Sequence, residues 1–574
     1  MKKILPCIFA FTVLFILYAC NSNNGSEKSD IAMDTATIAK GEKLFIQNCG
    51  TCHNFKQDGI GPQLSGITKT ATVTWISNFI KNPKQLIDSG DERAKKLFQK
   101  YHVVMPSFGA YGDSAIAAII AFLNTHNTIL TNNDDTDTSY LKDPIPTKIA
   151  LGGLTAELKF ITQFPASSDS GKLPLSRITK LSYEPSTGTS FVVDLRGKLY
   201  KMNGDKPVVY MDIAKLEPRF INAPGLGTGF GSFAFHPDFA RNGLLYTTHA
   251  ESVSSVKDDF NFPDSIKGSL QWVLTEWKTD HPDHVPFSGK PRELLRITMV
   301  TDMHGVQEIS FNPLSKPGDK DYGLLYIGVG DGGAVEHGYS FLAHSPQRVW
   351  GTVLRINPNG SNSKNKQYGI PADNPFASGT DPNTLKEIYA YGFRNPHRIT
   401  WSSSGQLLVS NVGHGNIESL NWVKPGNDFG WPIRESNFVV NAAGNLNKVH
   451  PLPADDSTYH ITYAVAEFDH DEGKAICGGY EYTGSAIPSL KGKYLFGDIP
   501  TGRLFYIDVK DVQQGKQATI KEWRITMGGV SKTLEQLCGS GRVDLHFGRD
   551  SKGEIYVLTK ADGKLYEIVS AVEK

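Results

Sequence analysis

The chain has 574 residues, and its 59 Lys and Arg residues are balanced by 59 Asp and Glu residues, so the formal net charge is zero. This length exceeds what one hydrophobic core usually supports, and more than one domain is expected. The balanced charge lacks the basic excess that is typical of nucleic-acid binding, so we expect no nucleic-acid partner.

Residues 1–20 have the features of an export signal. A basic start is followed by an apolar run from Ile8 to Tyr18 that is too short to span a membrane. A small residue precedes Cys20, and Asn and Ser residues follow it, which resembles a bacterial lipoprotein signal whose Cys becomes the lipidated first residue. We predict export and a lipid anchor at Cys20, on the periplasmic face of a bacterial membrane or at the cell surface. The alternative is a plain cleavable signal with a chance Cys.

Two polar runs divide the rest of the chain. Residues 21–38 have no apolar periodicity and are predicted to form a flexible tether. A second run of Asn, Asp, Thr and Ser lies within residues 127–148, which are predicted to form a linker. These runs delimit a small domain, residues 39–126, and a large one, residues 149–574.

The small domain contains the string Cys49-Gly50-Thr51-Cys52-His53. A C-x-x-C-H string is typical of covalent haem c attachment, in which the thiols of Cys49 and Cys52 add to the haem vinyl groups and His53 binds the iron. The alternatives are a disulfide hairpin or half of a zinc site, and both need partners that this neighbourhood lacks, because the next Cys is Cys477.

A second iron ligand is expected at a chain reversal further along. Met105 is our prediction, because Pro106 stiffens the backbone after it and lets the loop present the thioether to iron. His102 is the competing ligand, and an ordinary core Met is the remaining alternative. The segment Gly41–Asn124 resembles the cytochrome c family, with a helix entered at Gly41, the C-x-x-C-H string, a Gly-Pro turn and the Met-Pro loop. This resemblance implies a small all-α domain.

The large domain lacks helical periodicity and repeats a turn glycine followed by a strand-forming string. The six copies begin at Gly197, Gly243, Gly323, Gly405, Gly492 and Gly553. Repeats of this kind predict an all-β propeller, and six copies predict six blades. Related strings begin at Gly502 and Gly563, so counting alone also permits seven or eight. The strand around Leu158–Phe164 is expected to close the ring against the last blade.

Four strings in the large domain combine glycines with polar side chains. They are Gly229–Phe239, Asp302–Gly305 followed by Gly328–Gly333, Tyr391–Pro396, and Asn411–Glu418 leading into Gly426–Pro432. With these strings, the part from Leu158 to Ile568 resembles the glucose/sorbosone dehydrogenase family, whose quinoprotein members are six-bladed propellers that use pyrroloquinoline quinone (PQQ) and calcium. Several strings also resemble the hedgehog-interacting-protein-like branch of the same superfamily.

The resemblance implies the roles of three polar residues. His304 matches the general base that takes the sugar hydroxyl proton as hydride leaves for the quinone. Asp331 matches the carboxylate that holds this imidazole and stabilises its charged form. Arg394 matches the cation beside the quinone oxygens. The alternatives are a structural histidine at a blade turn, a turn-capping aspartate and a surface arginine.

Further positions follow from the same resemblance. Asn395 matches the partner of Arg394 beside the quinone. Gly413 and His414 match the positions whose backbone carbonyls bind calcium, a cation that prefers oxygen donors. Glu418 is either a support for that loop or a solvated carboxylate.

The sequence departs from the family in its cofactor-binding cations. The family's Gln falls at about Gly227, a Lys that grips a PQQ carboxylate falls at about Thr483, and an arginine pair is reduced to Arg542. Because PQQ is a tricarboxylate, losing these groups should weaken its binding by roughly a few kcal/mol unless others replace them. The residues that could replace them are Arg503, Lys474 and Lys493.

Cys477 and Cys538 are the cysteines that neither the signal nor the haem motif uses. In an oxidising compartment they could form a disulfide, and free buried thiols are the alternative.

Two functions remain open at this point. The first is an enzyme that oxidises an aldose or a related alcohol with PQQ and passes electrons to its haem and on to an external cytochrome or quinone pool. A fused cytochrome favours it, because a two-electron quinol needs a one-electron outlet. The second is a non-catalytic propeller that binds carbohydrate or protein beside an electron-transfer cytochrome.

Overall fold

A computed structural model describes residues 31–49, 53, 55, 61–101, 104–129, 139–168, 173–223, 225, 227–254 and 256–574. The predicted signal with Cys20, the second haem cysteine Cys52 and the alternative iron ligand His102 lie outside the described residues. Among the helices in the described ranges, none has the length and apolar character needed to cross a membrane.

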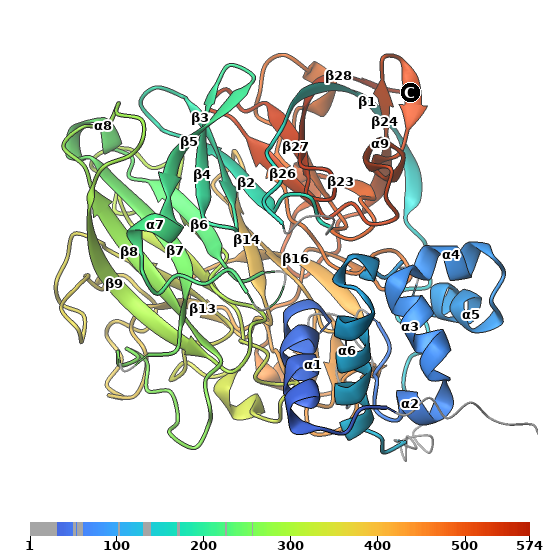
Figure 1. Cartoon of the computed structure of the whole chain (residues 1–574). Helices are drawn as coiled ribbons and strands as arrows, with labels where there is room; N and C mark the ends of the chain where they lie inside the picture. The colour runs from blue at the N-terminus through green and yellow to red at the C-terminus, as the bar shows by residue number, and fades with distance from the viewer. Residues whose placement is uncertain are drawn as a thin grey trace, which may run out of the picture.

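The N-terminal part is helical, as predicted (Figure 1). Its elements are α1 (Thr35–Asn48), α2 (Ile67–Thr70), α3 (Val73–Lys81), α4 (Pro83–Asp88), α5 (Glu92–Tyr101), the 3-10 turn η1 (Gly109–Tyr111) and α6 (Asp113–Thr125). Helix α1 begins inside the range predicted as a tether, because Asp34 caps it by accepting a hydrogen bond from the Thr37 backbone N–H at 2.9 Å.

Helices α1 and α6 pack against each other at Gly41. A Cβ atom at this position would stand 1.8 Å from the carbonyl oxygen of Ala118 on α6. Only glycine permits this approach. The contact lets the apolar side chains of both helices form one core, which includes Phe45, Ile119 and Leu123.

The rest of the chain is built from β-strands, which form five sheets within the described residues. The largest sheet holds, in spatial order, β21 (Tyr480–Glu481), β22 (Lys493–Gly497), β23 (Leu504–Asp508), β24 (Lys521–Met527), β1 (Ala150–Gln163), β28 (Lys564–Glu573), β27 (Ile555–Thr559), β26 (Leu545–Arg549), β2 (Ile178–Tyr183), β3 (Ser190–Asp194), β4 (Lys198–Asn203) and β5 (Lys206–Asp212), with β25 (Val530–Lys532) beside β24.

Three sheets in the described ranges have four strands each. They are β6 (Phe230–Phe235), β7 (Leu244–Ser252), β8 (Leu270–Lys278) and β9 (Lys290–Met299); β10 (Glu308–Phe311), β11 (Leu325–Val329), β12 (Thr352–Ile356) and β13 (Ile388–Tyr391); and β14 (Pro396–Trp401), β15 (Leu407–Asn411), β16 (Ile417–Val423) and β20 (Ala466–Asp469). The fifth sheet holds β17 (Arg434–Glu435), β18 (Phe438–Val440) and β19 (Val449–His450).

Short helices and 3-10 turns connect these strands. They are α7 (Ile213–Leu216), α8 (Phe239–Asn242), α9 (Leu534–Cys538), η2 (Ser340–Leu342), η3 (Asp456–Tyr459), η4 (Pro488–Leu490) and η5 (Val509–Asp511).

The repeated glycines mark the starts of strands, as the sequence predicts. Gly243 and Gly492 directly precede β7 and β22, and Gly405 lies two residues before β15. These glycines have φ angles of 63°, 73° and 85°, in the left-handed region that glycine adopts without strain. The glycines therefore recur because the backbone of each turn requires a conformation that glycine adopts without strain.

Strand β1 joins the start of the β-rich domain to its end. It pairs antiparallel with β28, with Leu158 opposite Ile568 and Phe160 opposite Tyr566, and it also pairs parallel with β24. The predicted pairing of this early strand with the last part of the chain is confirmed. The strand begins at Ala150, earlier than expected.

Three strands meet around a buried ion-pair network. Lys180 on β2 and Arg398 on β14 both bind the carboxylate of Glu308 on β10, and the Lys180 Nζ to Glu308 Oε1 distance is 2.6 Å. The three side chains are almost fully buried, so the carboxylate must be neutralised where the strands converge. This network fixes the strands whose ends carry the site described below.

The chain leaving the helical part runs along the β-rich domain. The Leu141 backbone N–H donates to the Val449 carbonyl at 2.8 Å, and the Ile145 N–H donates to Asp469 at 3.2 Å. These contacts hold the second half of the predicted linker against the large domain.

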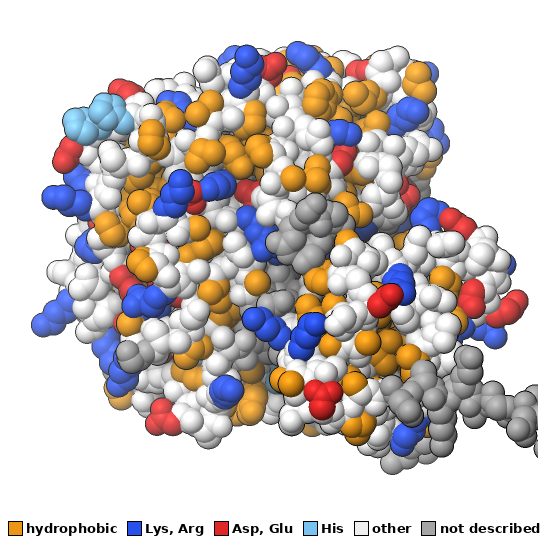
Figure 2. Space-filling model, in the orientation of Figure 1, with side chains coloured by type: hydrophobic (Ala, Val, Ile, Leu, Met, Phe, Trp, Pro, Cys, Tyr) orange, Lys and Arg blue, Asp and Glu red, His pale blue; other side chains and the backbone are white. Residues whose placement is uncertain are grey.

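Acidic and basic side chains are scattered over the face seen in Figure 2 and form no single-sign field, in keeping with the balanced charge.

Gly41→Val tests the helix contact. The added side chain must displace the Ala118 carbonyl, and overpacking of this kind costs about 1–3 kcal/mol, so we expect a lower unfolding temperature of the haem domain. The measurement is thermal unfolding of the full chain followed by haem absorbance. Ala39→Val adds similar bulk at an exposed position of α1 and serves as the control. Equal unfolding temperatures for the two variants would contradict the packing described.

Candidate functional site

His304 and Asp331 are brought together from two different turns. His304 lies between β9 and β10, and Asp331 follows β11. The His304 Nδ1 to Asp331 Oδ1 distance is 2.7 Å. Because Nδ1 is engaged, Nε2 is the ring nitrogen left for the cavity that His304 lines.

The Asp331 carboxylate is fully buried and held on both oxygens. Oδ2 accepts a hydrogen bond from Trp431 Nε1 at 2.9 Å, and Oδ1 also accepts from the Gly333 backbone N–H at 3.0 Å. Its orientation, and therefore that of the His304 ring, is fixed by the surrounding structure. The alternative of a simple turn-capping aspartate does not account for the bonds to His304 and Trp431.

The backbone around His304 is tightly constrained. His304 has a φ angle of 49°, which is uncommon for a residue with a side chain. A Cβ atom on Gly330 would stand 2.2 Å from the His304 carbonyl oxygen, and one on Gly305 would stand 2.0 Å from Trp272 Nε1. The glycines of the second string thus allow the histidine turn to approach the end of β11.

Arg394 lies beside this pair in a buried ionic group. Its Nη2 atom is 2.5 Å from Glu336 Oε1, and the same oxygen is 3.1 Å from His414 Nδ1. Burial opposes ionisation of Glu336, yet the Arg394 guanidinium and His414 hold its pKa well below the ordinary value. Arg394 is therefore a buried cation, and the alternative of a surface arginine is wrong.

The loop from Gly413 to Ile417 is held by two buried carboxylates. Glu435 Oε1 accepts the backbone N–H of His414 at 2.7 Å and of Ile417 at 3.1 Å. Glu418 accepts the Gly413 N–H at 3.2 Å and is completely buried, so it supports the loop and is not a solvated carboxylate. The Gly413 carbonyl accepts a hydrogen bond from Arg394 Nη1.

These residues line one cavity of about 550 Å³. From the β-rich domain it is lined by His304, Glu336, Arg394, Asn395, Gly413 and His414, among others. From the helical domain it is lined by Phe45, His53, Phe55, Phe122 and His126. The helical domain therefore covers the cavity of the large domain, and the predicted iron ligand His53 lies in the same lining as His304.

The predicted cofactor cations separate into two groups. Arg542 and Lys474 line the cavity, and Arg542 Nε is 2.8 Å from Asp544 Oδ1. Arg503 does not line it, because its guanidinium binds Glu472 and Glu522 at 2.7 and 2.8 Å.

The cavity lining also decides three other expected positions. Lys493 binds Asp508 and Glu573 and is not part of the lining. Thr483 packs against Gly553, also outside it. Gly227 does line the cavity, and its carbonyl accepts a hydrogen bond from the Gln307 side chain at 3.0 Å. Gln307 thus supplies an amide where the family's glutamine is missing.

The predicted haem ligands line a second cavity, of about 280 Å³. The His53 Nδ1 atom is 2.7 Å from the Pro62 carbonyl oxygen, which orients the ring. A Cβ atom on Gly61 would stand 2.4 Å from His53 Cε1, so the Gly-Pro turn must begin with glycine. Cys49 and Met105 line the same cavity, whose other lining is mostly apolar, as a haem requires.

The two cavities adjoin. Both are lined by Phe45, His53 and Arg542. The domains also touch beside Arg542, since a Cβ atom on Gly541 would stand 3.4 Å from Val104 Cγ2. Val104 directly precedes Met105, so this part of the large domain packs against the loop of the predicted second iron ligand.

Two family models match the chain. The glucose/sorbosone dehydrogenase model matches residues 179–567, and the cytochrome c model matches residues 38–127. The chain belongs to the glucose/sorbosone dehydrogenase family. It carries a cytochrome c domain at its N-terminal end, and such a domain binds haem. The predicted resemblance to both families is confirmed, and the large domain is β-rich and propeller-like.

Individual relatives agree with this assignment. HIPL1 protein of Arabidopsis thaliana is 26% identical over 378 residues, covering 58% of this chain and 52% of that protein. Quinoprotein glucose dehydrogenase B of Acinetobacter calcoaceticus is 26% identical over 350 residues, covering 55% of this chain and 64% of that protein. The chain thus spans between half and two thirds of the length of these relatives.

Solved structures show the same fold. The soluble aldose sugar dehydrogenase from Escherichia coli, in its apo-form, aligns with 73% of this chain and 100% of its own, with a TM-score of 0.50 and 16% sequence identity.

Cys477 and Cys538 are both free thiols in this family member. Burial raises the pKa of each, so neither is poised to react as a thiolate. Of the two alternatives, the disulfide is wrong and the free thiols are confirmed.

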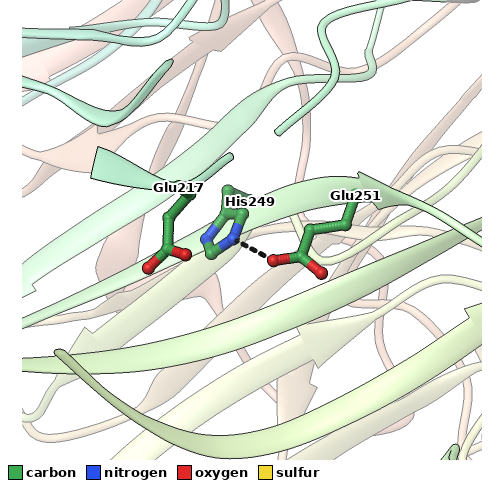
Figure 3. A group of neighbouring side chains, drawn as sticks. All are labelled: Glu217, His249 and Glu251. Atoms are coloured by element: carbon green, nitrogen blue, oxygen red, sulfur yellow. Dashed lines mark hydrogen bonds and ion pairs between the residues drawn. The ribbon is translucent and has the colours of Figure 1, made fainter. Parts of the chain in front are cut away.

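A second group of ligand-type side chains is formed by Glu217, His249 and Glu251 (Figure 3). His249 Nε2 is 3.2 Å from Glu251 Oε1. The other oxygen of Glu251 accepts hydrogen bonds from Arg219 and Arg296 at 2.8 and 2.7 Å. Because two arginines already neutralise this carboxylate, the group is an internal ion-pair network of the β6–β9 sheet.

Sequence reasoning missed several residues that build the site. Glu336 follows Asp331 by five residues, and its place near a glycine-rich turn was the only signal available. Trp431 lies inside the fourth string, but nothing in that string indicates a bond to Asp331. Glu435 and Gln307 gave no sequence signal, because their partners are defined only by the folded loops.

Proposed function

We propose that this protein oxidises an aldose sugar or a related alcohol in the large-domain cavity with PQQ and passes the electrons to haem c in the cytochrome domain. The observation that carries the proposal is the shared lining of the two cavities. The helix and loop that present Phe45 and His53 close the cavity of His304 and Asp331, so a haem on His53 would lie next to the oxidation site. A haem beside the cavity of a dehydrogenase domain can accept the two electrons of the reaction one at a time.

The cavity suits a quinone cofactor in size and chemistry. Its volume of about 550 Å³ lies in the range of cofactor sites, which is roughly 300–1,000 Å³. Arg394, Asn395 and Gln307 contribute polar side chains to the lining. PQQ, when bound, supplies the acceptor for a hydride equivalent from the sugar carbon.

His304 is proposed to act as the general base. Its Nε2 atom takes the proton of the sugar hydroxyl, and Asp331 stabilises the imidazolium through the 2.7 Å bond to Nδ1. The Trp431 bond keeps the Asp331 carboxylate in place while the charge on His304 changes. Arg394 supplies a fixed positive charge where negative charge develops on the acceptor.

Asp302 tunes this base. Burial raises the pKa of its carboxyl to about 6, and Oδ2 is buried without a hydrogen-bond partner among the described residues. Asp302 lines the same cavity, and its charge interacts with His337 and His304. When the pH rises through about 6, Asp302 becomes an anion and adds a negative charge to the cavity that His304 lines.

A calcium ion beside the quinone is part of the proposal, held by the backbone carbonyls of Gly413 and His414. Glu336 fits such an ion, because its Oε2 atom is buried and has no hydrogen-bond partner in the described part of the chain. The Arg394 hydrogen bond to the Gly413 carbonyl does not fit, since the guanidinium and a cation would compete for that oxygen. No step above depends on the ion.

We also propose that the strands form six four-stranded blades. The parallel contacts of β1 with β24 and of β2 with β26 divide the large sheet into three antiparallel runs of four strands. The three runs are β2–β5, β21–β24, and β26–β28 with β1. Three separate sheets, β6–β9, β10–β13, and β14–β16 with β20, bring the number of four-stranded groups to six. In the last group, β1 is the strand that closes the ring.

The cellular setting is proposed from the N-terminal sequence. Export and lipidation at Cys20 would hold the protein at the periplasmic face of a membrane or at the cell surface, near an external cytochrome or quinone pool.

A second candidate function is a non-catalytic propeller that binds carbohydrate or protein. The match to HIPL1 protein, whose name states no dehydrogenase activity, favours it.

Haem reduction tests the proposed function. The purified, haem-loaded protein is mixed with PQQ, calcium and a panel of aldoses, and the haem α-band is followed. We expect reduction only with quinone and sugar together, and a chelator in one arm tests the calcium requirement. His304→Ala should slow reduction by about 10²-fold or more, because it removes the base. His284→Ala, at an exposed position, is the matched control. Failure of every aldose to reduce the haem would favour the binding module.

The pH profile tests the role of Asp302. In the native protein the rate of sugar-dependent haem reduction should rise as the pH passes about 6, because ionised Asp302 then places a negative charge near the positive charge that develops on the base in the transition state. Asp302→Asn should remove this step and leave the profile flatter on its acid side. The measurement is kcat/KM from pH 5 to 8, with haem content confirmed at each pH. An unchanged profile in the variant would assign the step to another group.

A further inference from the structure

The β26–β27 end of the cavity carries a group of buried polar side chains with no role in the chemistry above. Lys560 follows β27, His546 lies on β26 and His397 lies on β14, and all three line the cavity. Their exposed fractions are 8%, 1% and 8%. Lys560 lies next to Asp544 on the neighbouring strand end, since its backbone N–H donates to the Asp544 carbonyl at 3.2 Å.

Three ring nitrogens of this group have no hydrogen-bond partner in the part of the chain that the structure describes. Both ring nitrogens of His546 and Nε2 of His397 are buried with no hydrogen-bond partner in the described ranges. The two rings are close, with centroids 5.7 Å apart. Lys560 lines the cavity beside these rings, and the nearby Asp544 carboxylate favours its charged form. Because buried polar groups are nearly always hydrogen-bonded, so many unpaired groups in one cavity indicate a polar ligand.

The charges of Lys560, His546 and His397 indicate which kind of polar ligand they would bind. Burial holds the pKa of both histidines well below the ordinary value, so they are neutral and can donate or accept. Burial also lowers the pKa of Lys560 to about 8, although Asp544 favours its charge. Asp544 is itself engaged by Arg542 Nε at 2.8 Å. The cavity end therefore has a cation, which opposes a metal ion, and neutral imidazoles, whose N–H groups can donate to a carboxylate.

We propose that Lys560, together with His546 and His397, binds a carboxylate of the quinone cofactor. The inference rests on the proposed function and names the residues that replace the missing family cations. The ammonium donates to one carboxylate oxygen, and an imidazole N–H donates to the other. His546 can supply such a donor in either tautomer, because both of its nitrogens are unpartnered. A bound carboxylate thus offsets the desolvation cost of the ammonium and of the imidazole that donates to it.

Equilibrium dialysis of PQQ against the haem-loaded full chain tests the proposal without turnover. Lys560→Met removes the charge and keeps the length of the side chain, and the Kd for PQQ should rise by about tenfold to a hundredfold, as expected when a charge-assisted hydrogen bond is lost. Lys560→Arg should stay within about threefold of the native protein. Lys552→Met, at an exposed turn before β27, should not change the Kd.

A second ligand separates carboxylate binding from structural damage. The trimethyl ester of PQQ has no carboxylate charge, so Lys560→Met should bind it as well as the native protein does. An equal loss of affinity for acid and ester would overturn the proposal, and so would an unchanged Kd for the acid. If Lys560→Met does not fold, His546→Leu is measured in the same way and must show the same acid-specific loss. Absence of PQQ binding by the native protein would instead refute the proposed function itself.

Discussion

The buried carboxylate of Asp331 is the constraint on which the site depends. It holds His304 through one oxygen and accepts the Trp431 hydrogen bond on the other, and its own backbone N–H donates to the Arg394 carbonyl at 2.8 Å. A fully buried carboxylate is costly unless each lone pair is used, so these contacts form together or not at all. The turn after β9, the end of β11 and the loop before β14 are therefore fixed relative to one another.

The cytochrome domain completes this site by covering it. Phe45 and His53 contribute to the lining of the dehydrogenase cavity, and the Val104–Gly541 contact seats the domain beside Arg542. A cytochrome domain held in this position need not diffuse to the cavity before it accepts electrons. The linker residues bound along the large domain keep the two domains together.

Local signals predicted much of the architecture. The C-x-x-C-H string and the turn glycines such as Gly243 act through backbone geometry or direct chain neighbours, so the sequence alone indicated a haem domain and a repeated β-fold. Glu336 and Lys560 could not be found in this way. Each gains its meaning from a residue far along the chain, Arg394 for the first and His397 for the second, and only the packing of strands brings them together. Arg503 shows the converse, since a suitable cation by sequence is neutralised by two glutamates in the fold.

The central claim is that electrons pass within one molecule from the sugar-oxidising cavity to the haem. The most direct measurement is a stopped-flow single turnover, in which the PQQ-loaded, oxidised protein is mixed with excess sugar and the haem α-band is recorded over a wide range of protein concentration. The account predicts a first-order rate constant that does not change with protein concentration, because donor and acceptor share one chain. A rate that rises in proportion to protein concentration would contradict it, since the haem would then be reduced by another molecule.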